Sequence, residues 1–110
     1  MSSRRPQARK RLLFTGGGGA SSEALRRFLS GRYDVHFADA DPEAKPYSVP
    51  PGAWHQIPFA SESTFVETLG CLCRELKVDV LVPGVDEELL SILQARDTIG
   101  CEVLLPSTEF

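Results

Sequence analysis

Short apolar runs alternate along this chain with stretches in which apolar residues recur at helical spacing. The run Arg11–Thr15 stops at four glycines, which predicts a buried strand followed by a tight turn. From Ser21 to Gly31 the apolar positions recur at helical spacing, and the serines at the start can cap a helix. The run 33–38, closed by Asp39, predicts a second strand.

The second half repeats this alternation after a long interruption. Residues 40–54 hold four prolines and a glycine, so we expect a long loop there with no regular element. Beyond it we expect a strand at 55–57, a helix over 62–76 capped by Ser61 or Ser63, a strand at 78–82, a helix from Asp86 to Gly100, and a strand at 101–105.

Strands and helices that alternate in this way favour right-handed crossovers and a parallel sheet. The predicted fold is α/β: a doubly wound, mostly parallel five-stranded sheet of order 3-2-1-4-5, with helices on both faces. In that order the chain reverses direction between strands one and four, and a ligand crevice opens at their carboxyl ends. The turns after these strands supply the candidate binding residues, which are Gly16, Gly17, Gly18, Gly19, Ser21, Gly84, Asp86 and Glu87.

The glycine run has three interpretations. It matches the first two glycines of the dinucleotide fingerprint G-x-G-x-x-G, but Ser21 replaces the third, and Asp39 takes the place of a ribose-binding acid. It could instead bring helix N–H groups against an anionic substrate, or serve only as the tight turn that glycine allows. A P-loop is excluded because no lysine follows the glycines at the required spacing.

The acidic run Asp86, Glu87 and Glu88 also has more than one interpretation. Carboxylate oxygens suit magnesium, and they could equally orient a substrate amine. Acids at the start of a helix also cap it and complement its dipole, which requires no ligand. We therefore assign no catalytic residue and no metal ligand from this run.

The cysteines and histidines are expected to be structural. Cys71 and Cys73 lie two apart on a predicted helix, so they fall on different faces and cannot share a metal. No cysteine or carboxylate accompanies His36 or His55 at a useful spacing, so neither is expected to be a ligand or a base.

Charge is distributed unevenly along the 110 residues. Residues 1–11 carry five basic side chains and no acid, whereas the rest of the chain has a net charge of −8. We interpret residues 1–10 as a disordered, solubilising tail, and the acidic remainder excludes a broad nucleic-acid surface. No run is apolar enough for a membrane span or a signal peptide, and three cysteines are too few for a disulfide scaffold. A cytoplasmic location is expected.

Four motifs in this order resemble the amino-terminal segment of ATP-grasp ligases, closest to proteins like the large subunit of carbamoyl phosphate synthase. The motifs are residues 13–19, 35–41, 82–89 and 104–107. The resemblance covers residues 11–110 and implies a Rossmann-like pre-ATP-grasp domain that lines the acceptor-substrate side of an active site. ATP-binding lobes follow this segment in the family, so the chain alone would hold no cofactor and would be inactive.

By that resemblance, the full-length parent would join a carboxylate to an amine or ammonia, using ATP and magnesium. Its partners would be a downstream ATP-grasp domain and a small-molecule acceptor, with neither nucleic acid nor membrane. Two other classes stay open. One is a small Rossmann-like NAD(P)- or nucleotide-binding module, and the other is a non-catalytic interaction domain that uses the 40–54 loop.

Overall fold

A computed structural model describes residues 9–16, 20–45, 49–84 and 86–104. Its centre is a five-stranded sheet of order β3-β2-β1-β4-β5, in which every neighbouring pair of strands is parallel. The predicted fold class and strand order are therefore confirmed. The strands are β1 (Arg11–Thr15), β2 (Asp34–Asp39), β3 (Trp54–Gln56), β4 (Val80–Val82) and β5 (Glu102–Val103).

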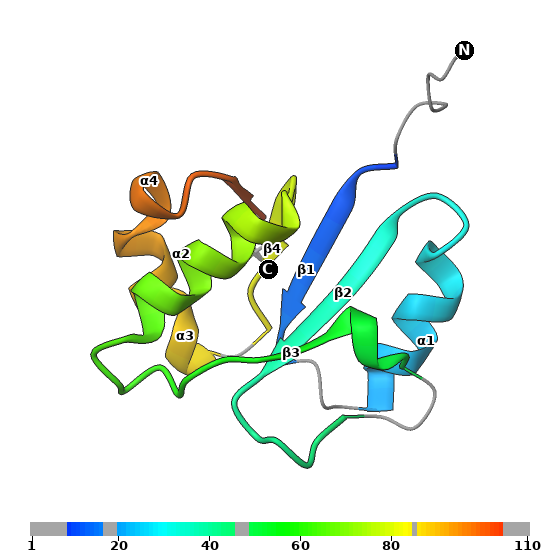
Figure 1. The fold of residues 1–110 in the computed structure, drawn as a ribbon, viewed down its shortest axis with the longest axis horizontal. Helices are drawn as coiled ribbons and strands as arrows, with labels where there is room; N and C mark the ends of the chain where they lie inside the picture. The colour runs from blue at the N-terminus through cyan, green and yellow to red at the C-terminus, as the bar shows by residue number, and fades with distance from the viewer. Residues whose placement is uncertain (1–8, 17–19, 46–48, 85, 105–110) are drawn as a thin grey trace, which may run out of the picture.

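Helices lie on both faces of this sheet (Figure 1). On one face, α1 (Ala20–Leu29) packs through Leu29 against a small core around Phe37. On the other, a larger core around Leu13, Leu69 and Leu81 joins the sheet to the remaining helices. These are α2 (Phe65–Leu76), α3 (Asp86–Gln94) and α4 (Arg96–Ile99).

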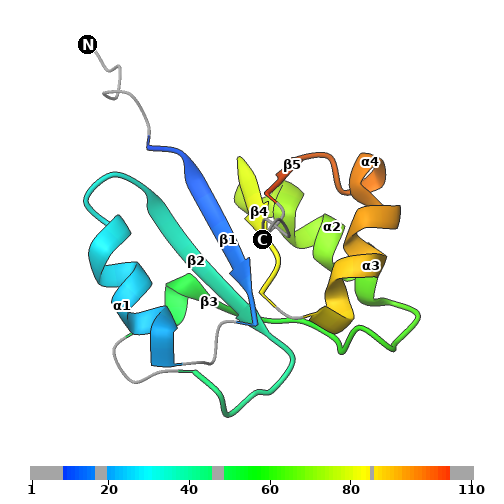
Figure 2. The same cartoon turned by 180° about the vertical axis from the view of Figure 1, so that it is seen from behind.

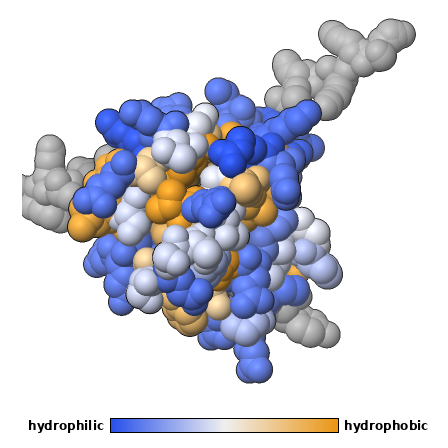
Figure 3. Space-filling model, turned by 60° about the vertical axis from the view of Figure 1, so that its left-hand side comes forward, coloured by the Kyte–Doolittle hydropathy of each residue, from blue (hydrophilic) through white to orange (hydrophobic). Residues whose placement is uncertain are grey.

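The outer surface on the side of these three helices is mostly hydrophilic. Figure 3 shows polar side chains over most of that side, with a smaller apolar area near its middle. Among the described residues, no helix is both long enough and apolar enough to cross a membrane.

Element boundaries differ from the expected ones where local turns replace regular structure. Neither Ser61 nor Ser63 caps α2, because Thr64 stands at the cap position and makes no side-chain cap bond. The expected third helix is broken at Ala95 into α3 and α4, and it ends at Gly100, whose φ of 87° is left-handed. Contrary to expectation, the 40–54 loop contains a 3-10 turn at Pro51–Ala53.

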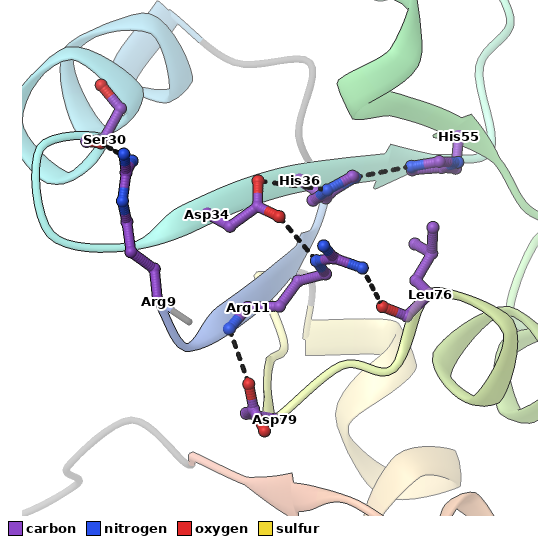
Figure 4. Close-up of polar contacts among 8 residues, drawn as sticks. All are labelled: Arg9, Arg11, Ser30, Asp34, His36, His55, Leu76 and Asp79. Atoms are coloured by element: carbon purple, nitrogen blue, oxygen red, sulfur yellow. Dashed lines mark hydrogen bonds and ion pairs between the residues drawn. The ribbon is translucent and has the colours of Figure 1, made fainter. Parts of the chain in front are cut away.

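A polar network joins the strands near their amino ends (Figure 4). The Arg11 Nε donates to Asp34 Oδ2 at 2.6 Å, and the guanidinium also donates to the Leu76 carbonyl at the end of α2. The Arg11 backbone N–H donates to Asp79 Oδ2 at 2.7 Å. One residue thus ties β1 to β2, to the start of β4 and to the helix that covers them.

The two histidines form a pair within this network. His36 Nδ1 lies 2.9 Å from His55 Nε2, and His36 Nε2 lies 3.4 Å from Asp34 Oδ1. When the neutral His36 carries its proton on Nε2, facing the carboxylate, its Nδ1 accepts a hydrogen bond from the His55 Nε2–H. Burial lowers the pKa of His36, with Asp34 opposing and Arg11 reinforcing the shift. Burial, and then the nearby His36, lower the pKa of His55.

The absence of a side chain at Gly84 allows the turn after β4 to approach the end of β1. A Cβ on Gly84 would lie 2.3 Å from the Thr15 carbonyl oxygen, far inside van der Waals contact. The Gly84 N–H also donates to Thr15 Oγ1 at 3.0 Å. These contacts fix the distance between the end of β1 and the turn after β4.

The His36–His55 pair should make the protein less stable in mild acid. Because the folded-state pKa values are lowered, the unfolded chain binds more protons once the pH falls toward the unfolded value of 6.5. The free energy of unfolding should therefore drop as the pH falls through 6.5. The double variant His36→Gln/His55→Gln should flatten this slope in urea titrations. Equal slopes for both proteins would contradict the interpretation.

Gly84→Ala should destabilise the protein by about 1–3 kcal/mol, because the new methyl group overlaps backbone that cannot rotate away. The matched control is Gly52→Ala, since a Cβ at Gly52 meets nothing within 4 Å. That control should change stability by less than about 0.5 kcal/mol. Thermal and urea unfolding measure both, and similar losses in the two variants would show that the close approach is unimportant.

Candidate functional site

The carboxyl ends of β1, β2 and β4 meet at one edge of the sheet, because β1 lies between the other two strands. Gly16 follows β1 directly with a φ of 67°, the left-handed conformation that glycine adopts without strain. The next element along the chain is α1, which begins at Ala20. Gly17, Gly18 and Gly19 lie outside the described residues, as does the side chain of Ser21.

The turn after β4 lies against the carboxyl end of β1. Gly84 meets Thr15 through the contacts given above, so the two turns lie side by side. Asp86 and Glu87 open α3 and are exposed. The structure thus brings Gly84 to the end of β1, and it leaves the Asp86 side chain in solvent.

A cavity of about 160 Å³ opens between the end of β2 and the start of α3. It is lined by Asp39 at the end of β2, by Glu87 and Glu88 on α3, and by the apolar residues Ala40, Phe59 and Ala60. A larger hollow of about 470 Å³ shares Ala40 and Phe59 with it and runs along the loop after β3. The two hollows therefore border each other at Ala40 and Phe59, and their other lining residues include Thr68 on α2 and Glu87 and Glu88 on α3.

Glu88 is a site residue whose burial sequence reasoning missed. Only 4% of it is exposed, and its Oε1 is buried without a hydrogen-bond partner. Burial raises the pKa of the Glu88 carboxyl; a hydrogen bond with the Thr15 hydroxyl opposes this, and the nearby Asp39 and Glu87 add to it. The one available signal was spacing, because Glu88 lies four residues before the buried Ile92 on the same helix face.

Asp39 closes β2 at the position that the sequence predicts. Its Oδ1 accepts a hydrogen bond of 2.9 Å from the Asp41 N–H, a local turn that holds the carboxylate at the sheet edge. The residue is half-buried and lines the smaller cavity. Asp39 ends β2 and Gly16 follows the neighbouring strand β1, so both residues lie at the carboxyl edge of the sheet.

Metal binding finds no support in the part of the chain that the structure describes. No group of three histidine, cysteine or acidic side chains there is arranged to hold an ion. Cys71 is exposed and Cys73 buried, so they face different ways as predicted. Cys73 instead pairs with Cys101: a hydrogen bond between the two thiols, and then burial, raise the pKa of Cys73.

The comparisons with known proteins give similarity of fold. No family model matches the sequence. No curated protein matches it. The enzyme WbmG of Bordetella bronchiseptica, solved in complex with NAD, matches 94% of this chain with a TM-score of 0.64 and 16% identity. Its complex with NAD and UDP matches 90% of the chain, with a TM-score of 0.64 and 17% identity.

An oxidoreductase of the short-chain dehydrogenase/reductase family from Burkholderia thailandensis also matches. The match covers 69% of this chain and 31% of that one, with a TM-score of 0.50 and 26% identity. The chain spans 39% and 38% of the two WbmG chains. The alignment therefore concerns one part of larger enzymes, and the fold it supports is Rossmann-like.

The expected relation to ATP-grasp ligases is wrong. The structures that match are NAD-bound or of the short-chain dehydrogenase/reductase type, so ATP, magnesium and a downstream ATP-grasp domain lose their support. The physical reason lies in the motifs themselves. A glycine turn after the first strand, an acid after the second and acids opening a helix after the fourth suit any doubly wound sheet. What these comparisons support is a Rossmann-like fold shared with NAD-binding enzymes.

Proposed function

We propose that this chain is a Rossmann-like NAD(P)-binding module, with its site at the carboxyl edge of β1, β2 and β4. The observation that carries the proposal is the meeting of three features at this edge. They are the left-handed Gly16 after β1, the start of α1 shortly beyond it, and Asp39 at the end of β2. These are the parts that a dinucleotide site needs for pyrophosphate and ribose.

The glycine turn and the start of α1 would hold the pyrophosphate. Glycines let a ligand approach the backbone closely, and free N–H groups at a helix N-terminus favour negative charge. In this proposal Gly16, Gly17, Gly18, Gly19 and Ser21 form that cradle. Gly84, Asp86 and Glu87 belong to the opposite wall, which the Thr15–Gly84 contact holds in place.

Asp39 would bind the adenosine ribose. A carboxylate accepts hydrogen bonds from both ribose hydroxyls, and it repels the 2′-phosphate that distinguishes NADP from NAD. The Asp41 N–H occupies one side of Oδ1, which fixes the direction of the carboxylate. The proposal therefore favours NAD over NADP.

The base would enter the hollow next to Asp39. Ala40 and Phe59 form an apolar wall shared by both cavities, and 58% of Phe59 is exposed, which leaves its ring accessible for stacking. A flat apolar wall beside a carboxylate suits a nucleoside, which has a stacking base and a sugar with hydroxyl groups.

We extend the proposal to domain organisation and location. Residues 11–110 would be one domain, and residues 1–10 a basic tail outside it. The cytoplasm fits the three free thiols, including the adjacent Cys73 and Cys101, because a reducing compartment keeps such pairs unbridged.

NAD should bind and shift the amide resonances of Gly16, Ala40 and Gly84 in two-dimensional NMR titrations. Asp39→Asn should weaken NAD binding by roughly tenfold, the scale of one hydrogen bond to a charged group, and should improve the relative affinity for NADP. The ratio of the two affinities is the decisive quantity, because it does not depend on how much of the variant is folded.

The control is Asp41→Asn, an exposed neighbour whose own Oδ1 serves a local turn through the Glu43 N–H. It should leave the NAD-to-NADP ratio unchanged. If about 5 mM NAD shifts no resonance, the dissociation constant lies above that of any specific cofactor site. That result would reject the proposed function. If NAD binds and Asp39→Asn changes neither its affinity nor the NAD-to-NADP ratio, only the role of Asp39 is rejected.

A further inference from the structure

The described residues cover only part of one face of the sheet. Seen from behind, α1 lies beside β1 and β2, and no helix of the described residues lies in front of β4 (Figure 2). A hollow of about 380 Å³ lies over the uncovered part, and it is lined from β1 and β4 by Leu12, Phe14, Val80 and Val82. A parallel sheet is normally buried on both faces, so this surface is unusual for its fold.

The apolar surface continues beyond the strands. Leu29 on α1 lines the same hollow, and Leu25 and Phe28 share its helix face at the spacings i, i+3 and i+4. Phe28 is 83% exposed, and Leu104, which follows β5, is 55% exposed. Large apolar side chains gathered at one surface mark a contact site rather than ordinary scatter.

We propose that a second copy of this chain covers this face, with the two sheets packed face to face about a two-fold axis parallel to the strands. Such an axis places β5 of one copy over β1 of its partner, and β4 over β4. The uncovered strands are three, in the order β1-β4-β5, so the pattern maps onto itself. Sheets packed in this way lie about 10 Å apart, which leucine and valine side chains fill.

Charge complementarity supports a copy of the same chain as the occupant. Lys10 lies at the β1 rim of the hollow, and Glu102 lies at the β5 rim. The register pairs Leu12 with Val80 and Val80 with Glu102, so Lys10 lies two residues below the level of Glu102. Under the proposed axis, Lys10 of each copy faces Glu102 of the other, within reach of two extended side chains.

The remaining exposed groups fit the same arrangement. Because α1 lies beyond β1 on this face, the axis carries it to the outer side of the partner's β5. Leu25 and Phe28 then approach the partner's sheet edge, where Leu104 is exposed. The helix also covers an edge strand that is otherwise open to pairing with other chains.

Sedimentation equilibrium of the full chain tests this, because a dimer of moderate affinity dissociates on dilution between about 200 and 1 μM. Lys10→Glu and Glu102→Lys should each weaken the dimer about tenfold, since each sets like charges against each other. The double variant Lys10→Glu/Glu102→Lys should restore the wild-type constant, because the swapped charges again attract. Recovery on charge exchange is the result that a mere loss of folding could not produce.

Glu75→Lys is the matched control, because it makes the same charge change at an exposed position of α2 on the opposite face. It should leave the association constant unchanged. A wild-type chain that stays monomeric over the whole concentration range overturns the proposal. That result is expected if a different partner, and not a second copy, covers this face. The proposal is also overturned if the chain dimerises and neither single variant changes the association constant, because the two copies would then meet through another surface.

Discussion

The close approach of Gly84 to Thr15 is the constraint on which the rest of this structure depends. β1 is the central strand, and its carboxyl end touches the turn after β4 with no side chain between them. That contact sets where α3 begins, and therefore where Glu88 enters the interior beside Thr15. The shape of the crevice, the burial of an acid within it and the position of its second wall all follow from one missing Cβ.

The two edges of the sheet handle their polar groups differently. At the amino edge, Arg11 donates hydrogen bonds to both Asp34 and Asp79. His36 lies between Asp34 and His55 and extends this network. At the carboxyl edge, Glu88 keeps a buried oxygen without a partner next to a cavity. Because an unpartnered buried acceptor costs free energy, satisfied groups serve the fold and unsatisfied ones point to a ligand. This asymmetry agrees with ligand binding at the carboxyl edge of doubly wound sheets.

The ATP-grasp resemblance shows how far local motifs reach. Glycines after the first strand and acids at the start of α3 satisfy backbone and dipole requirements that every fold of this type shares. They predicted that the turns after β1 and β4 lie side by side, and Gly84 does lie against Thr15 at the end of β1. They could not identify the chemistry, because the chemistry depends on which groups surround the ligand. Strand order is common to the whole class, whereas the placing of Glu88 and Asp39 around one cavity depends on how α3 packs on the sheet.

The sequence by itself determined the alternation of elements, the strand order and the edge at which Asp39 and the glycine turn meet, because strand periodicity and chain handedness are local properties. Tertiary structure decided what depends on register and packing. Asp34 lies two residues before His36, on the same face of the strand, yet only the pairing of β2 with β3 brings His55 within 2.9 Å of His36. Likewise the sequence shows three consecutive acids, and only the packing of α3 on the sheet buries Glu88 while leaving Asp86 and Glu87 exposed. Residues distant in sequence become neighbours through the core, and no local pattern encodes that distance.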